Sequence, residues 1–283
     1  MDKAGVQAAF VAAGLPRLVK DLDLISKASI RLYTTPVDES ALHIGASKLG
    51  GAPDLPVGVT WPAWKGLPQS FIAQIHLGDI APYDANNLLP HSGMLWFFYD
   101  AQQQTYGADP ADRGGWCVIF VDDNLPALQR TPAPATLPAS SQFHACSISF
   151  ASEITLSQQP QLEIPNCDWT EAEQHQYETL LSTFPSPADH ATIHHRLLGH
   201  PDTIQDDMRL QCQLTSHGVT DVNDPRAAAL SQGAMDWQLL LQIDSDEHAG
   251  MNWGNNGMLY YWIERADLQT HLFDHTWLVL QSE

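Results

Sequence analysis

The chain has 283 residues, of which 44% are hydrophobic and 16% are charged, and its formal net charge is −20 because 33 Asp and Glu outnumber 13 Lys and Arg. This composition predicts a well-buried globular core and argues against intrinsic disorder. The shortage of basic residues argues against binding to nucleic acid or to an anionic membrane, since either partner requires a basic surface.

Two further global features bear on the environment of the chain. No apolar run approaches the ~20 residues that a membrane-spanning helix needs. The four cysteines, at positions 117, 146, 167 and 212, form no C-x-x-C pair, so neither a zinc site nor a redox couple is indicated. We therefore expect a cytoplasmic protein without a metal or cofactor. The acidic balance either attracts a cationic partner or serves solubility alone.

Residues 1–32 are predicted to form N-terminal helices of the mature protein rather than a signal peptide. Val6 and Phe10 lie on one helical face, and after a break at Pro16 the apolar residues Leu18 and Leu22 repeat at helical spacing. A strand, "SIRLYTTP", follows these helices.

Residues 33–125 form the first half of a predicted internal repeat. The loop "SKLGGAPDLP" precedes three predicted strands, "SFIAQIHL", "GMLWFFYD" and "GGWCVIFV". Residues 126–190 form a middle segment with a Pro-rich stretch, the strand-like runs "FHACSISF" and "SEITL", and one helix. Thr170 and Glu173 have the spacing of a capping box at the start of that helix.

Residues 191–283 repeat the landmarks of the first half in the same order. "RLLGHPDTI" parallels "KLGGAPDLP", "WQLLLQID" parallels "SFIAQIHL", "GMLYYWI" parallels "GMLWFFY", and "WLVL" parallels "WCVIF". This order predicts a single domain over residues 1–283 of the α+β class. Its antiparallel sheets would form two halves related by a pseudo-twofold axis, the product of an internal duplication.

Gln74 and Gln242 occupy the same place in the two halves, within strands that are apolar throughout. Such strands are expected to be covered on both faces. A buried amide must find hydrogen-bond partners or cost about 1–3 kcal/mol. Each glutamine therefore either ties a neighbouring segment or lines a shared cleft.

These motifs together resemble the YwqG-like family of bacterial proteins, a domain of unknown function. The resemblance rests on "SKLGGAPDLP" with "WP", "FIAQIHL", "LPHSGMLWFFYD", "HRLLGHPDTIQDDM", "LLLQIDSD" and "MNWGNNGMLYYWI", and it extends from about Ile44 to the C-terminus. The resemblance implies an α+β fold with internal duplication, and it brings no established reaction. Members of this family also occur near secreted-toxin loci, an association that suggests an immunity role. Asn255 stands where the resemblance leads us to expect Asp, which weakens any metal-dependent activity.

Acidic residues gather in two short stretches of the second half. Asp244, Asp246 and Glu247 follow a buried strand, and Asp206 with Asp207 follow the repeated loop. Carboxylates that converge could hold Ca²⁺ or Mg²⁺, but the spacing matches no strict cation loop. The alternative is a solvated acidic face that binds a partner.

Catalytic motifs are missing from the sequence. It contains no H-E-x-x-H, no G-x-S-x-G and no P-loop. We therefore predict no catalytic residues. Trp61, Trp64 and Trp253 lie in loops beside Gly or Pro and are candidates for a contact surface.

The sequence favours a non-enzymatic protein-binding module. We expect an immunity-type protein whose acidic surface occludes a basic protein partner such as a toxin domain. The alternative is an enzyme, or a protein that binds a small ligand or a divalent cation, with its site in a cleft between the two halves.

Overall fold

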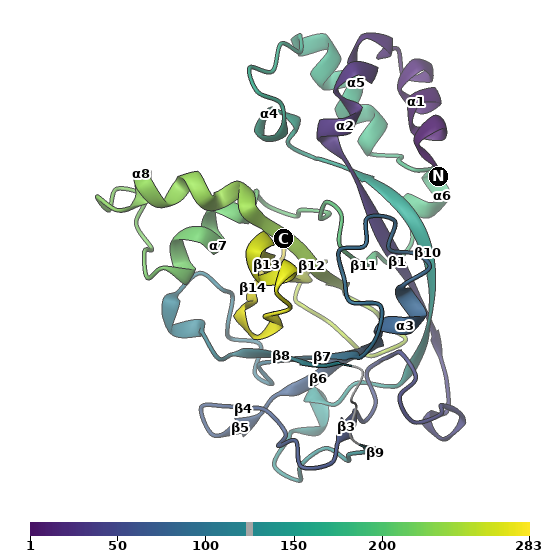
Figure 1. The fold of residues 1–283 in the computed structure, drawn as a ribbon, viewed down its shortest axis with the longest axis vertical. Coiled ribbons are helices and arrows are strands. Elements are labelled where there is room, and N and C mark those ends of the chain that lie inside the picture. Colours follow the sequence, from purple (N-terminus) through teal and green to yellow (C-terminus); the bar gives the residue numbers. More distant parts are fainter. Residues whose placement is uncertain (123–126) are drawn as a thin grey trace.

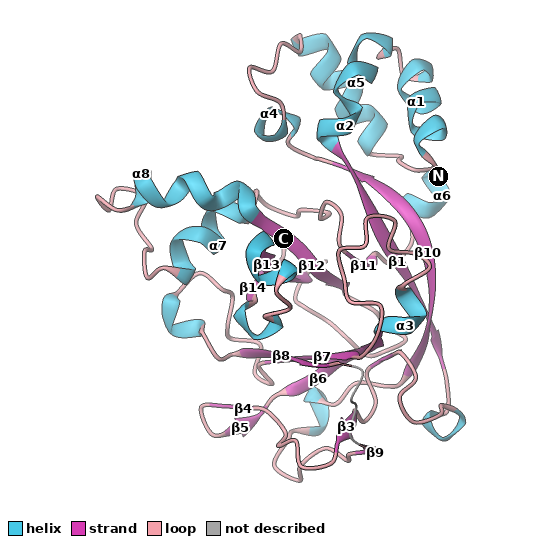
Figure 2. Ribbon diagram, viewed as in Figure 1, coloured by secondary structure: helices cyan, strands magenta, loops and turns pink. Residues whose placement is uncertain are grey.

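The structure of the protein is a computed structural model that describes residues 1–122 and 127–283 (Figures 1 and 2). The strands are β1 (Ser26–Pro36), β2 (Lys48–Leu49), β3 (Asp54–Pro56), β4 (Ala63–Trp64), β5 (Leu67–Pro68), β6 (Ser70–His76), β7 (Met94–Tyr99), β8 (Trp116–Val121), β9 (Leu128–Arg130), β10 (Cys146–Leu156), β11 (His195–Leu197), β12 (Trp237–Asp244), β13 (Met258–Glu264) and β14 (Trp277–Gln281).

The α-helices are α1 (Lys3–Ala12), α2 (Leu22–Ile25), α3 (Leu77–Ile80), α4 (Pro160–Glu163), α5 (Glu171–Leu181), α6 (Pro187–His190), α7 (Arg209–Ser216), α8 (Ala227–Leu230) and α9 (Arg265–Gln269). Short 3₁₀ helices cover Pro16–Asp21, Glu39–Ala41, Pro110–Asp112, Ala139–Ser141, Ser231–Asp236 and Phe273–His275. None of the helices in the described ranges is both long enough and apolar enough to cross a membrane.

A ten-stranded antiparallel sheet forms the body of the molecule, in the order β14-β13-β12-β11-β1-β10-β2-β6-β7-β8. The long pair β1 and β10 lies at its centre, in register from Ser26 opposite Leu156 to Pro36 opposite Cys146. The two strand-like runs predicted in the middle segment are therefore one continuous strand. Pairing with the whole of β1 satisfies its backbone groups without a break.

The strand order is symmetric about the central β1–β10 pair when each strand of the first half is matched with its predicted counterpart in the second half. A short strand, β2 or β11, follows the central pair, and three longer strands complete each side. We call β6, β7 and β8 the first arm, and β12, β13 and β14 the second arm. The register shifts at one place in each arm, between Phe71 and Ala73 and between Leu239 and Leu241.

The sheet bends so that its two arms pack against each other, as the ribbon in Figure 1 shows. The ring centroids of Phe97 and Tyr261 are 5.2 Å apart, and those of Trp116 and Trp277 are 4.9 Å apart. The Tyr261 hydroxyl donates a hydrogen bond to the backbone oxygen of Phe98 at 3.1 Å. The arms therefore share one core. Nearly every residue of β6, β7, β12 and β13 is buried, so these strands are covered on both faces, as predicted.

The helices α1, α2 and α5 gather at one end of the β1–β10 pair and enclose a smaller core (Figure 1). Phe10 and Tyr177 contact each other there, with ring centroids 5.8 Å apart. The capping box of Thr170 and Glu173 begins α5, as predicted. The predicted boundary at residue 125 lies outside the described residues.

Candidate functional site

Gln74 on β6 joins three segments of the first half through its fully buried amide. Its Oε1 accepts a hydrogen bond from the backbone N–H of Asp54 at 2.7 Å. Its Nε2 donates to the backbone oxygen of Ala46 at 2.8 Å and to Asp54 Oδ2 at 2.9 Å. Trp96 on β7 donates from Nε1 to the backbone oxygen of Asp54 at 3.0 Å. The amide is satisfied, and its role in this half is structural.

Gln242 on β12 makes the same contacts in the second half. Its Oε1 accepts from the backbone N–H of Asp202 at 2.9 Å, and its Nε2 donates to the backbone oxygen of His194 at 2.7 Å and to Asp202 Oδ2 at 3.0 Å. Tyr260 takes the place of Trp96 and donates its hydroxyl to the backbone oxygen of Asp202 at 2.6 Å. Each arm therefore holds an aspartate loop by one glutamine and one aromatic donor.

A turn with two consecutive left-handed residues leads into each aspartate loop. Gly50 and Gly51 have φ of 61° and 72°, and Leu198 and Gly199 have φ of 62° and 80°. A Cβ atom at Gly199 would lie 2.6 Å from Ser29 Cβ, so no larger residue fits. The glycine in each of the two loops is thus required by the backbone and by a close neighbour.

Asp54 is a fully buried carboxylate between two cations. Its Oδ1 lies 2.9 Å from Arg130 Nε, and its Oδ2 lies 3.5 Å from Lys48 Nζ. Burial acts to raise the pKa of Asp54, but hydrogen bonds from Arg130 and from the Gly45 N–H, with the charge of Lys48, outweigh it. The pKa is held below its ordinary value, and the carboxylate stays ionised.

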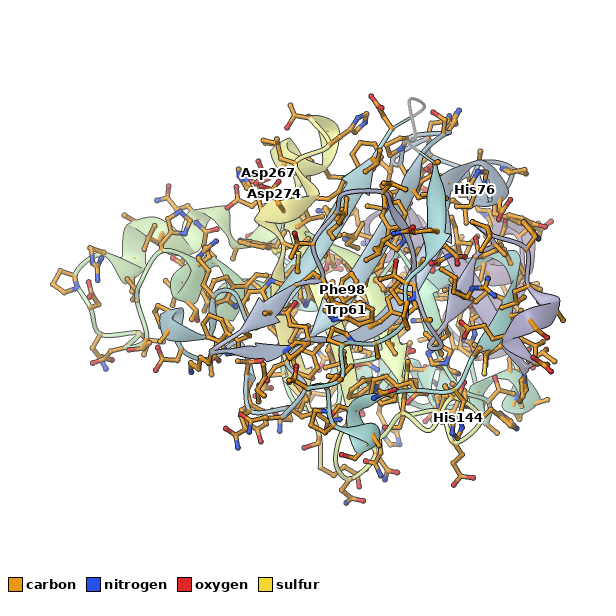
Figure 3. All side chains as sticks on the ribbon, turned by 90° about the horizontal axis from the view of Figure 1, so that it is seen from below. Trp61, His76, Phe98, His144, Asp267 and Asp274 are labelled. Carbon is orange, nitrogen blue, oxygen red and sulfur yellow. The ribbon has the colours of Figure 1, made fainter. Side chains whose placement is uncertain are left out.

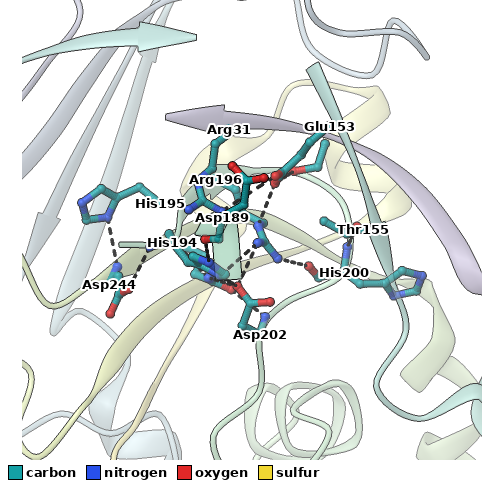
Figure 4. Close-up of polar contacts among 12 residues, drawn as sticks. Arg31, Glu153, Thr155, Asp189, His194, His195, Arg196, His200, Asp202 and Asp244 are labelled. Carbon is teal, nitrogen blue, oxygen red and sulfur yellow. Dashed lines mark hydrogen bonds and ion pairs between the residues drawn. The ribbon is translucent and has the colours of Figure 1, made fainter. Parts of the chain in front are cut away.

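Asp202 has the equivalent position but is partly exposed. Its Oδ2 lies 2.8 Å from Arg196 Nη2 and 2.7 Å from His194 Nδ1, and Arg196 Nε lies 3.1 Å from Glu153 Oε1 (Figure 4). Burial acts to raise the pKa of Asp202, but Arg196 and His194 hold it well below its usual range. The Asp202 side chain is 31% exposed, whereas that of Asp54 is 0% exposed.

A groove of about 960 Å³ opens beside Asp202, and we call it the acidic–histidine groove. Its titratable lining residues are Asp202, Asp244, Glu247, His190, His194 and His248. Its amide lining residues are Gln158, Asn252, Asn255 and Asn256. Among the described residues, no Lys or Arg lines this groove. The volume falls within the range of ligand-binding sites.

Two histidines fix the carboxylates at the floor of the groove. Asp244 Oδ2 accepts from the backbone N–H of His194 at 2.8 Å, and the Asp244 N–H donates to His195 Nδ1 at 3.1 Å. His195 Nδ1 is therefore an acceptor, which places the hydrogen on Nε2, 3.2 Å from Asp246 Oδ2. Thr34 donates to the same oxygen at 2.8 Å.

Asp246 is thereby saturated with internal partners. Its side chain is fully buried, and burial acts to raise its pKa. Hydrogen bonds from His195 and Thr34 outweigh burial and hold the pKa of Asp246 well below its usual range. Asp246 thereby holds one ring nitrogen of His195, while the other accepts from the Asp244 N–H.

The five carboxylates predicted as a binding face lie in four different settings. Asp244 and Glu247 line the acidic–histidine groove, and Asp246 is buried beneath it. Asp207 forms a 2.8 Å ion pair with an arginine of α7. Asp206 is exposed, and its backbone oxygen accepts a hydrogen bond from a glutamine of β14.

The three tryptophans predicted as a contact surface are not brought together. Trp61 packs edge-on against Phe98, with ring centroids 5.6 Å apart, on the outer side of the first arm (Figure 3). Trp64 ends β4 and is half-buried. Trp253 is only 1% exposed, because it packs between Tyr99 and Phe143.

Asn255 lies at the rim of the acidic–histidine groove, exposed, with Nδ2 3.4 Å from Glu283 Oε2. The groove also contains His248, which belongs to the acidic stretch of Asp244 to Glu247 in the sequence, and His190, His194 and Asp202, which the sequence did not place in a site. Adjacent histidines and the repeated Gly-x-Pro-Asp motif were the available signals. These residues come together because the segment around β11 lies beside the end of β12.

In the part of the chain that the structure describes, no three His, Cys, Asp or Glu side chains form a set that could hold a metal ion. The four cysteines are free. What the groove offers is a polar, anionic and hydrogen-bonding surface.

A family model for a domain of unknown function, DUF1963, matches residues 47–282, which include both arms and the groove. The chain belongs to the DUF1963 family. No curated protein matches this DUF1963 chain. The narrower resemblance to the YwqG-like family stays a prediction.

Proposed function

We propose that this DUF1963 chain is a non-enzymatic binding module whose acidic–histidine groove receives a positively charged segment of a protein partner. In the sharper form of this proposal the module is an immunity protein and the partner is a secreted bacterial toxin. The contrast between Asp54 and Asp202 carries the proposal.

The comparison of Asp54 with Asp202 distinguishes what the loop needs for its structure from what could serve binding. Both aspartates support the same loop through the same contacts, and complete burial of Asp54 demonstrates that the loop needs no exposed carboxylate. Asp202 is nevertheless 31% exposed and lines a groove. Where two halves share one scaffold, the feature that differs is the better candidate for function.

The lining of the groove fits a cationic guest. Asp244 and Glu247 supply carboxylates, and three asparagines supply amides that can accept from ammonium or guanidinium groups. The net charge of −20 would draw a basic partner from a distance and accelerate association at low salt.

A labelled hexa-arginine peptide tests the groove directly, with hexa-glutamate as the charge-reversed control. Fluorescence anisotropy should show binding of hexa-arginine only. The double variant D244N/E247Q should weaken it by about tenfold or more, because each close charge pair adds roughly 1 kcal/mol. The matched control E178Q, whose carboxylate is 74% exposed on α5, should leave affinity unchanged. Equal weakening by E178Q would attribute binding to net charge and reject the groove.

The immunity form of the proposal has a separate test. Co-expression with the product of the adjacent reading frame should give a stable complex and suppress any toxicity of that product. The complex should be lost in D244N/E247Q. A complex that this double variant retains at full affinity would place the interface elsewhere.

We also infer that the two halves arose by duplication of one unit. The strand order that reads alike from both edges supports this, as do the matched contacts of Gln74 and Gln242 and the matched register shifts. Independent convergence would have to reproduce each of these features. Family members in which one half retains the glutamine–aspartate pair while the other lacks the entire loop would argue against it.

A further inference from the structure

A second cavity lies between residues of the two halves, away from the acidic–histidine groove. It has a volume of about 560 Å³, and we call it the inter-arm cleft. Residues 86–89 of the first half form one side, and the start of β12 with α9 forms the other. Its apolar lining residues are Leu88, Leu89, Leu198, Leu239 and Leu268.

The charges in the inter-arm cleft are opposite to those of the rest of the molecule. Lys27 and Arg265 line it, and no Asp or Glu does so among the described residues, although the chain has 33 acidic residues. Arg265 Nε is 4.0 Å from Asp236 Oδ1, and both side chains are more than half exposed. The cleft is therefore a local concentration of positive charge in an acidic protein.

Lys27 has no ion-pair or hydrogen-bond partner for its ammonium group in the described part of the chain. Its residue is half-buried at the start of β1. Burial lowers the pKa of Lys27, and the neighbouring charges of Arg209 and Arg265 lower it further against the opposing effect of Glu163. A cation in this position gains from an anion that replaces its lost hydration.

A small adjoining cavity of about 20 Å³ shares Lys27 and Gly199 with the cleft. His200 and Trp262 line it and are 4% and 2% exposed. His200 Nε2 and Trp262 Nε1 are buried without a hydrogen-bond partner among the described residues. Trp Nε1 can only donate, and burial with nearby cations lowers the pKa of His200 well below its usual value, which leaves a neutral ring. Unsatisfied buried groups of this kind call for a bound partner.

We propose that the inter-arm cleft binds a small organic carboxylate with an apolar body. Its acid group faces Lys27 and Arg265, and its apolar body lies on the leucine side chains. The space beside His200 and Trp262, which Asp207 also lines, holds a water that bridges to the carboxylate. The volume suits a ligand of this size, and the apolar lining disfavours a bare inorganic anion.

Octanoate is a suitable probe, and isothermal titration calorimetry is the measurement. Octanoate should bind once per chain. n-Octanol should bind at least about tenfold more weakly because it lacks charge-assisted hydrogen bonds. Inorganic phosphate should also bind at least about tenfold more weakly, because it lacks an apolar body to cover the leucine side chains. K27M removes the charge and keeps the aliphatic stem, so it should weaken octanoate by about tenfold or more. R265Q should weaken it to a smaller degree, because Arg265 is more than half exposed.

Two controls make the outcome decisive. K65M removes an exposed lysine on the β4–β5 turn and should not change octanoate affinity. K27M should melt no lower than the wild type, because a half-buried lysine with a lowered pKa destabilises the fold at neutral pH. Binding of n-octanol as tight as that of octanoate, or full affinity in both K27M and R265Q, would overturn the proposal. This test is independent of the acidic–histidine groove, since D244N/E247Q should bind octanoate normally.

Discussion

Gln74 and Gln242 make the same three hydrogen bonds in opposite arms of one sheet, each to a backbone oxygen, a backbone N–H and a carboxylate. Both side chains are 0% exposed. Their carboxylate partners differ, because Asp54 is sealed in the core whereas Asp202 reaches a groove. The two sites therefore allow matched comparisons within one molecule.

Replacement of either glutamine by leucine should destabilise the protein. Each change leaves a buried N–H and a buried oxygen without partners, which costs about 1–3 kcal/mol per group. Q74L and Q242L should each lower the free energy of unfolding by at least about 2 kcal/mol in urea titrations. Q129L, at an exposed position on β9, should change it by less than about 0.5 kcal/mol. A large loss in one arm alone would contradict the equivalence of the two sites.

Substitution of Asp54 should mainly affect stability, whereas substitution of Asp202 should mainly affect binding. D54N leaves Lys48 and Arg130 without their buried counter-ion, and the loss of one partner of a buried pair costs about 3–5 kcal/mol. D202N should cost less, because its site is partly open to water, yet it should weaken binding of the hexa-arginine peptide. Urea titration and anisotropy on both variants check this pair of expectations. Weakened peptide binding in a folded D54N protein would count against the groove.

Acid should unfold the protein through its low-pKa carboxylates. Asp54, Asp202 and Asp246 have folded-state pKa values held below the ordinary 3.8, because their hydrogen bonds and cations outweigh the opposing effect of burial. The stability they contribute is present above the unfolded pKa and is lost as the pH falls through the folded pKa. Unfolding free energies should thus fall steeply below about pH 4, and D202N should flatten that fall. An equally steep fall in D202N would assign the acid sensitivity elsewhere.

The sequence predicted much of the fold because its signals are local. The apolar strands around Gln74 and Gln242, the repeated Gly and Asp of the loops, and the capping box of Thr170 follow from neighbours in the chain. The sequence did not predict that Trp253 is buried, because its loop neighbours are polar and its packing partners, Tyr99 and Phe143, are distant in the chain.

The candidate sites were less predictable for the same reason. Asp244 and Glu247 were identified by their density of charge, whereas Asp246, two residues from Asp244, is fully buried because His195 and Thr34 enclose it. No spacing rule distinguishes the two environments. The sequence around Lys27 gives no sign of a site, because the other segments of its cleft lie about 60 to 240 residues away along the chain.

The cysteines give a test of the core that is independent of binding. Burial raises the pKa of Cys117 and of Cys146 to about 11, and it raises the pKa of Cys212 well above its ordinary value. The thiolate is the reactive form, so these three should resist iodoacetamide at pH 8 in the native protein. Cys167 is partly exposed beside the helical core and should be alkylated first, as peptide mass spectrometry would show. Unfolding in urea should make all four react at similar rates, because the protection comes from packing rather than from sequence. Rapid native alkylation of Cys212, which lies on α7 at 0% exposure, would mean that α7 detaches from the second arm.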